Sequence, residues 1–188
     1  MLSTLLYRSR VIIRAIAPFI DERTRVLDIG CGNAVVSSEI MRHFGCRLIG
    51  TDVQKYLSRN IEFRKMPSYN KLDFNNNEFD LGLFNDVLHH IPGGLQMVLI
   101  KEALRVCSRV LVFEVEPSLL AKLAEYPLNW INNRNVPIPL SHRAKEEWLE
   151  LFQENHIRSN FYPVARPSLW YPFVNYLFYL EYSRGIAG

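Results

Sequence analysis

The sequence lacks the features that mark several special classes of protein. Its 188 residues include only three cysteines, Cys31, Cys46 and Cys107, an odd and sparse set without metal-ligand spacing. This set argues against a disulfide scaffold or a metal site and indicates reduced thiols, as in a cytoplasmic protein. We find no internal repeat, low-complexity tract or linker. A chain of this length that is 48% hydrophobic is therefore predicted to form a single domain over residues 1–188.

The sequence also has no strong excess of charge of either sign. It carries 22 Lys and Arg against 19 Asp and Glu, which gives a net charge of +3 spread along the chain. The only dense basic run is Arg8, Arg10 and Arg14, and its helical spacing predicts a solvated face. Because nucleic-acid binding usually needs a clustered basic stripe, the charge pattern disfavours a nucleic-acid partner.

Long uninterrupted apolar runs are missing as well. Residues 1–20 mix arginines into an apolar pattern, so they lack the core of a signal peptide. Their apolar residues recur at helical spacing, which predicts an amphipathic helix covering the sheet. The most apolar late stretch, 169–180, is too short to span a bilayer. We therefore expect no membrane span and a cytoplasmic location.

Strand and helix patterns alternate along the chain. The predicted helices lie at about 3–18, 33–44, 94–106 and 143–155, with a short helical turn after Asp52. The predicted strands lie at 25–29, 47–51, 61–65, 79–84, 109–115, 157–163 and 174–181. This alternation predicts an α/β fold with a Rossmann-like, doubly wound and mostly parallel sheet that has helices on both faces. The short link between the last two strands predicts that the final strand is antiparallel.

The most informative segment is an apolar strand that runs into a glycine turn. Asp28, Gly30 and Gly32 form an Asp-x-Gly-x-Gly pattern before a predicted helix, and Asp52 follows Gly32 by twenty residues. The missing Cβ atoms let a ligand approach the backbone beside a positive helix end. Asp52 ends the next strand, within reach of a ribose diol. The pattern predicts a nucleotide-like cofactor at the carboxyl edge of the sheet.

Details of the loop decide between cofactors. The dinucleotide fingerprint needs a Gly or Ala three residues after the second Gly, and that position is Val35. The dinucleotide fingerprint also does not require an acidic residue inside the strand, whereas this strand contains Asp28. The pattern with Asp52 instead resembles the first motif of the class I S-adenosylmethionine-dependent methyltransferases, which implies S-adenosylmethionine as the cofactor.

The resemblance continues from about residue 22 to residue 182. Segments 72–81 and 85–91 resemble the stretch around strand four that ends in Leu-His-His, and 111–117 resembles strand five. Segments 146–152 and 176–180 resemble a helix and the last strand of the small-molecule, type 11-like branch. The resemblance implies methyl transfer by in-line displacement to a small, partly apolar acceptor.

The resemblance also implies which residues bind the cofactor. They are Asp28 for the amino group, Gly30, Cys31 and Gly32 in the loop, Asp52 for the ribose, Val53, Ser68 and Tyr69 beside the adenine, and Asn85 beside the methionine part. The sequence departs from the family at Ser68, where an acid usually contacts the adenine.

His89 and His90 are the candidates for catalysis. An imidazole titrates near neutrality and could remove a proton from an acceptor hydroxyl. Successive residues of a helix point about 100° apart, so we do not expect both rings to face one pocket. The alternative is that one of them caps or packs the start of a helix. Glu114, inward on strand five, and His142 are further candidates.

Two further features bear on the function. Residues 117–142 form a long segment rich in Pro and Asn, which predicts a substrate lid.

A nucleic-acid or protein methyltransferase is one alternative function, but Asn85-Asp86-Val87-Leu88 lacks the Pro-Pro-aromatic turn of the base-modifying enzymes. A cofactor-binding partner subunit without activity is another, and the short segment after Asp52 favours it.

Overall fold

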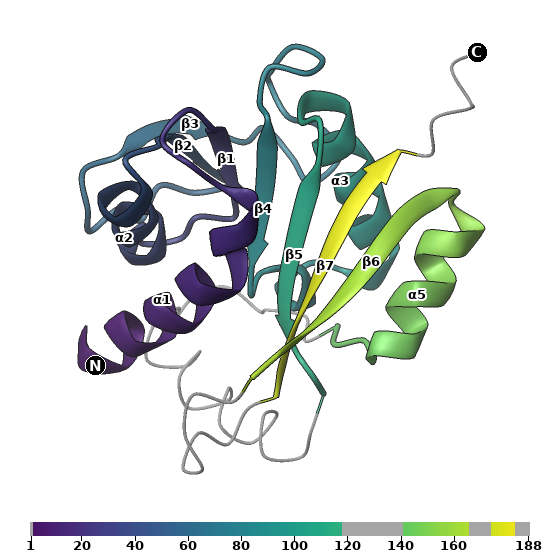
Figure 1. The fold of residues 1–188 in the computed structure, drawn as a ribbon. Coiled ribbons are helices and arrows are strands. Elements are labelled where there is room, and N and C mark those ends of the chain that lie inside the picture. The colour runs from purple at the N-terminus through teal and green to yellow at the C-terminus, as the bar shows by residue number, and fades with distance from the viewer. Residues whose placement is uncertain (1, 118–140, 166–173, 183–188) are drawn as a thin grey trace.

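A seven-stranded sheet with helices on both faces makes up the described part of the chain (Figure 1). The computed structural model describes residues 2–117, 141–165 and 174–182, with side chains from Tyr7 onward. The strands are β1 (Arg25–Ile29), β2 (Arg47–Asp52), β3 (Glu62–Lys65), β4 (Leu81–Asn85), β5 (Val110–Val115), β6 (Ile157–Val164) and β7 (Asn175–Tyr182). They lie in the order β3-β2-β1-β4-β5-β7-β6, and β7 runs antiparallel to both of its neighbours. The predicted fold class is confirmed.

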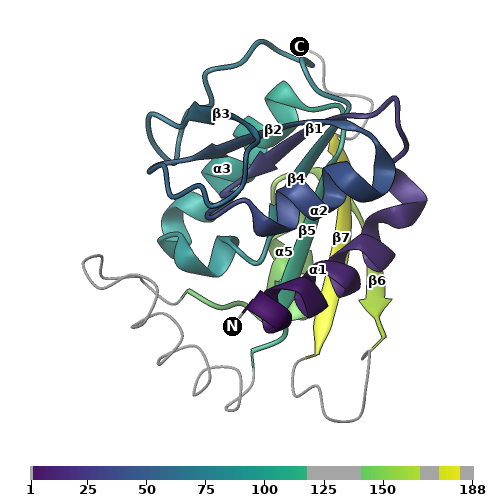
Figure 2. The same cartoon turned by 90° about the vertical axis from the view of Figure 1, so that its left-hand side faces the viewer.

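In the described part of the chain, two pairs of helices bury the two faces of the sheet (Figure 2). The helices are α1 (Leu2–Ile16), α2 (Val35–Phe44), α3 (Gly93–Val106) and α5 (Lys145–Glu154), with short 3-10 helices at Ala17–Phe19 and Leu88–His90. Leu83 of β4 packs in the cluster that holds Ile12 and Ile16 of α1, whereas the next residue, Phe84, packs with Trp148 of α5. This alternation is expected because successive strand residues point to opposite faces.

The order of the strands reverses between β1 and β4. The chain passes from β1 to β2 on one side, while β4 and β5 lie on the other side of β1. Ligands of open α/β sheets bind outside the carboxyl ends of the strands at such a point of reversal. In Figure 1 this edge lies at the bottom, where β5 ends. The candidate residues 30–32, 52 and 85–90 all lie at or just after the carboxyl ends of strands at this edge.

The structure corrects one predicted element. The short helical turn expected after Asp52 is wrong, because residues 53–60 form bends and irregular backbone. Ser58 donates both its N–H and its hydroxyl to the carbonyl of Asn33, at 2.9 Å each. These bonds tie the segment to the glycine loop instead of closing a helical turn. The predicted lid at 117–142 lies outside the described residues, apart from Pro117, Ser141 and His142.

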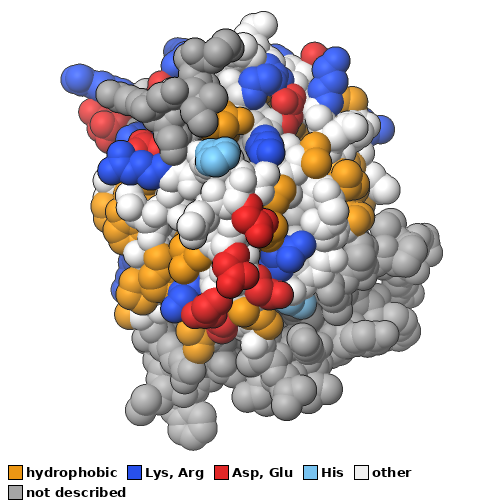
Figure 3. Space-filling model, turned by 90° about the vertical axis from the view of Figure 1, so that its right-hand side faces the viewer, with side chains coloured by type: hydrophobic (Ala, Val, Ile, Leu, Met, Phe, Trp, Pro, Cys, Tyr) orange, Lys and Arg blue, Asp and Glu red, His pale blue; other side chains and the backbone are white. Residues whose placement is uncertain are grey.

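Acidic side chains gather on the side of the molecule that carries α5 (Figure 3). The exposed acids of this helix are Glu146, Glu147, Glu150 and Glu154. Such a cluster of acids is electrostatically unfavourable for a phosphate backbone. None of the described helices is long and apolar enough to cross a membrane.

Candidate functional site

The loop between β1 and α2 is hydrogen-bonded to β2, and there is open space beside one of its glycines, Gly32. The N–H groups of Gly30 and Cys31 donate to the carbonyl of Thr51, at 2.8 and 3.2 Å. Both Gly30 (φ +77°) and Gly32 (φ +52°) are left-handed. A Cβ on Gly30 would lie 2.3 Å from Cγ2 of Val87, whereas a Cβ on Gly32 would meet no described atom within 4 Å. Packing thus requires Gly30, and Gly32 borders open space that a ligand can enter.

Asp28 joins the loop to α2 and β4. Its side chain is buried, and its two oxygens accept hydrogen bonds from Ser37 Oγ at 2.6 Å and from Asn85 Nδ2 at 3.0 Å. Burial raises the pKa of Asp28 to about 6, against the lowering effect of these two bonds. The structure thus brings Asp28 and Asn85 together at the base of the loop. The described donors to its carboxylate are thus side chains of α2 and β4.

Asp52 accepts a hydrogen bond from the loop itself. Its Oδ2 lies 3.0 Å from the N–H of Gly32, and its Oδ1 lies 3.4 Å from the N–H of Gln54. Burial raises the pKa of Asp52, and these N–H groups partly offset that rise. Two carboxylates, Asp28 and Asp52, therefore flank a loop whose Gly32 N–H is already bonded. A pyrophosphate would meet like charge here, whereas ribose hydroxyls can donate to Asp52.

The other predicted cofactor residues extend this side of the edge. The N–H of Met66 donates to the carbonyl of Asp52 at 2.9 Å, which brings the segment after β3 beside β2. Tyr69 is half-buried, and burial followed by the charge of Asp52 raises its pKa. Ser68 donates its hydroxyl to Asn70 within the same segment. Val53 directly follows Asp52 and packs against the core.

Cys31 contributes to the loop through its backbone N–H, which bonds to Thr51. Burial raises the pKa of its thiol, and the charges of Asp28 and Asp52 raise it further. A thiol in this state stays protonated and is a poor nucleophile. All three cysteines are free, as expected.

A second buried group lies where β4 turns toward α3. Oε1 of Glu114 accepts the N–H groups of Val87 and Leu88, at 3.1 and 2.7 Å, and its Oε2 lies 2.6 Å from Nδ1 of His89. Burial alone would raise the pKa of Glu114, but the charge and hydrogen bond of His89 and the N–H of Leu88 lower it overall. Glu114 thereby fixes both the turn and the imidazole.

Two more histidines surround His89. Its ring stacks on that of His142 with centroids 4.7 Å apart, and the ring of His90 lies 4.0 Å away. The two neighbours in sequence lie close together because Leu88–His90 is a single 3-10 turn. The N–H of Ser141 donates to the carbonyl of His89 at 2.8 Å. Across the described ranges, no three His, Cys, Asp or Glu side chains are arranged to hold a metal ion.

Sequence reasoning missed a contact between α1 and the end of β4. The solvated face predicted for Arg8 is wrong, because its Nε donates to Oδ2 of the buried Asp86 at 2.6 Å. The two residues are 78 positions apart, and no local pattern in the sequence links them. The N-terminal helix therefore contributes a cation to the carboxyl edge of the sheet.

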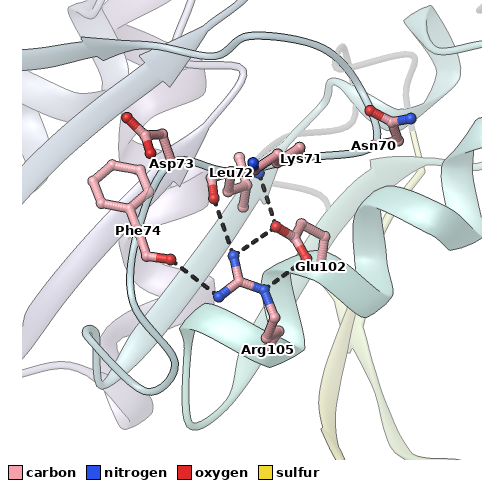
Figure 4. A pocket seen from close by; sticks show the side chains of 7 residues that line it. All are labelled: Asn70, Lys71, Leu72, Asp73, Phe74, Glu102 and Arg105. Carbon is pink, nitrogen blue, oxygen red and sulfur yellow. Dashed lines mark hydrogen bonds and ion pairs between the residues drawn. The ribbon is translucent and has the colours of Figure 1, made fainter.

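An open hollow also lies away from this edge, between the 70–74 segment and α3 (Figure 4). Arg105 lines this hollow, and its guanidinium donates to the carbonyls of Leu72 and Phe74 at 3.0 Å each and to Glu102 at 2.6 Å. These hydrogen bonds hold the 70–74 segment against α3. We therefore assign the hollow a structural role.

Comparisons with known proteins agree with this geometry. The profile of a family described as "Methyltransferase domain" matches residues 27–112, which contain the loop, Asp52 and both candidate histidines. A search of curated proteins returned no match.

Solved structures share the fold. A SAM-dependent methyltransferase from Methanosarcina mazei is 16% identical, with 89% of this chain and 96% of that chain covered and a TM-score of 0.67. A protein from Pyrococcus horikoshii OT3 is 20% identical, with 94% and 91% covered and a TM-score of 0.63. The magnesium protoporphyrin IX methyltransferase from Synechocystis PCC 6803, with bound SAH, is 12% identical, with 94% and 84% covered and a TM-score of 0.65.

Residues 27–112 match the methyltransferase-domain family, and the chain shares its fold with solved SAM-dependent methyltransferases.

Proposed function

We propose that the chain transfers the methyl group of S-adenosylmethionine to a small, partly apolar acceptor by in-line displacement. The observation that carries the proposal is the open space at Gly32, which is flanked by Asp28 and Asp52. Two acids suit a ligand that presents ribose hydroxyls and a cationic sulfonium. The residues present therefore fit the cofactor.

Each predicted residue receives a role from its position. Asp52 binds the ribose hydroxyls, and the backbone of the glycine loop lies against the ligand. The remaining assignments are Asp28 and Asn85 for the methionine part, and Val53, Ser68 and Tyr69 for the adenine. These assignments agree with the order of the segments along the edge of the sheet.

The chemistry places modest demands on the protein. The bound cofactor supplies a methyl group already activated by its sulfonium. The chain has to hold the acceptor atom in line with the methyl carbon and sulfur, which can supply roughly 7–11 kcal/mol in well-oriented cases. As the bond from the acceptor atom to carbon forms, the carbon–sulfur bond breaks and its electron pair stays on sulfur.

The acceptor's proton goes to His89 in this proposal. Nδ1 of His89 faces the carboxylate of Glu114 at 2.6 Å, and in this proposal the other ring nitrogen, Nε2, acts as the base. A positioned base of this kind contributes about 10²–10⁴ in rate. His90 is half-buried and does not share the bond to Glu114.

A pair of variants tests the role of the histidines. We expect His89→Ala to lower turnover by about 10²–10⁴ while S-adenosylhomocysteine affinity stays within about threefold. An acceptor is first found by screening small alcohols, phenols and amines for release of S-adenosylhomocysteine from the wild-type protein. His90→Ala is measured in parallel, and His43→Ala, an exposed histidine on α2, is the control. Undiminished turnover in His89→Ala contradicts the base assignment, and a loss in His90→Ala alone moves the role to His90.

A cofactor-binding subunit without activity is the second candidate. The specific observations in its favour are Ser68 in place of an acid and the lack of a crossover helix over the described residues 53–60. In that case the protein binds S-adenosylhomocysteine but gives no turnover with any acceptor.

A further inference from the structure

The first residue after β4, Asp86, has an unusual backbone. Its φ is +54°, in the left-handed region that non-glycine residues seldom occupy. Its N–H donates to the carbonyl of Phe113 at 2.8 Å, so β5 holds it there. Such strain persists where the surrounding structure imposes it, often at functional sites.

The carboxylate of Asp86 is buried and only half satisfied. Its side chain is 4% exposed. Oδ2 pairs with the guanidinium of Arg8, which keeps this oxygen turned toward α1. Oδ1 is also buried, and no group in the described part of the chain hydrogen-bonds to it. Because buried acceptors are nearly always paired, an orphaned carboxylate oxygen indicates a missing hydrogen-bond donor.

The position of Asp86 lies between the cofactor loop and the buried histidine. The next residue, Val87, fills the space that a Cβ of Gly30 would need, at 2.3 Å. Val87 and Leu88 also donate to Glu114, the carboxylate that holds His89. Asp86 thus joins the two halves of the site, at the point where β4 lies beside β1.

We propose that Oδ1 of Asp86 binds an O–H or N–H group of the methyl acceptor, beside the atom that is methylated. This inference rests on the proposed function and deepens it, because it limits the acceptor to hydroxylated or amino compounds. Arg8 occupies the other oxygen, so the carboxylate presents a single acceptor atom to the site. Asp86 orients the acceptor, and His89 remains the group that takes the proton.

The same oxygen could instead serve the ammonium group of the cofactor, and three probes separate the two sources. Sinefungin carries an amine where the cofactor carries its transferable methyl group. S-adenosylhomocysteine has the amino-acid ammonium but nothing at the methyl position, and 5′-methylthioadenosine lacks the amino acid. Dissociation constants of all three are measured by calorimetry for the wild-type protein and for Asp86→Asn.

We expect Asp86→Asn to weaken sinefungin by about tenfold or more, as for loss of a charged hydrogen bond, and to change the other two ligands by less than about threefold. The control is Glu116→Gln, which removes a half-buried acid just beyond β5 and is expected to leave all three constants unchanged. A selective loss of S-adenosylhomocysteine and sinefungin together, with 5′-methylthioadenosine unaffected, assigns Asp86 to the cofactor ammonium and overturns the proposal. Equal losses of all three, or none, overturn it as well.

A second variant guards against misfolding of Asp86→Asn. Arg8→Gln removes the cation but keeps the carboxylate, so it is expected to retain or increase the preference for sinefungin over S-adenosylhomocysteine. Loss of that preference contradicts the proposal. A wild-type protein that binds none of the three probes instead refutes the proposed function itself.

Discussion

Replacing Gly32 with valine is expected to weaken S-adenosylhomocysteine binding by about 100-fold or more. The side chain would enter the open space beside Asp52, where no described atom lies within 4 Å of a Cβ. The protein can therefore accommodate the new atoms, and the ligand cannot. Overpacking of this kind costs about 1–3 kcal/mol and occasionally more, and each 1.4 kcal/mol is tenfold in affinity. Calorimetric titration measures the change.

The control for this variant is Gly45→Val. Gly45 follows α2 with φ +68°, close to the +52° of Gly32, and a Cβ there would meet only Glu22 Cβ, at 3.7 Å. Both variants should lose a similar stability, about 1–2 kcal/mol for a left-handed residue with a side chain. Gly45→Val should bind S-adenosylhomocysteine normally. Equal affinities for the two variants contradict the placement of the ligand at Gly32.

Among the variants considered, replacing Glu114 with alanine is expected to cause the largest loss in the free energy of unfolding. The carboxylate accepts two backbone N–H groups and pairs with His89, all at the buried turn after β4. Removing one partner of such a buried group costs about 3–5 kcal/mol, or a fall in Tm of roughly 10 °C for a chain of this size. Calorimetry at pH 7 measures the change. Glu114→Gln keeps an oxygen for the two N–H groups, so its loss should be smaller.

The pH dependence gives this prediction a second readout. The folded protein lowers the pKa of Glu114 below its usual 4.5, through His89 and the N–H of Leu88 and against the effect of burial. The carboxylate therefore stabilises the fold above about pH 4.5, and this stabilisation is lost as the pH falls further. The gap between wild type and Glu114→Ala should narrow on acidification. A constant gap contradicts the ionised role of Glu114.

Local patterns were sufficient to predict the fold and to select candidate residues for the site. Apolar runs at periods of two and 3.6 residues located the strands and helices, and the short link between the last strands indicated their antiparallel pairing. The spacing of Asp28, Gly32 and Asp52 predicted a cofactor site at this edge of the sheet, and in the structure Asp52 accepts the N–H of Gly32 at 3.0 Å. These features depend on residues in consecutive elements.

Contacts between distant elements could not be predicted in the same way. The pairing of Arg8 with Asp86 joins α1 to β4, and the helical spacing of the arginines indicated only a solvated face. The contact of Gly30 with Val87 depends on β1 and β4 being neighbours in the sheet. Glu114 was a candidate because it points inward, but its bonds to Val87, Leu88 and His89 follow from the tertiary fold.

The most direct test of the account is thermal unfolding with S-adenosylhomocysteine, with NAD as the control. A ligand at about 100 times its Kd stabilises the fold by about 2.7 kcal/mol, or roughly 5–10 °C for a chain of this size. The two carboxylates beside Gly32 predict a rise with S-adenosylhomocysteine and none with NAD. A rise with NAD, or with neither ligand, would contradict the assignment of this loop to the methyl-donor cofactor.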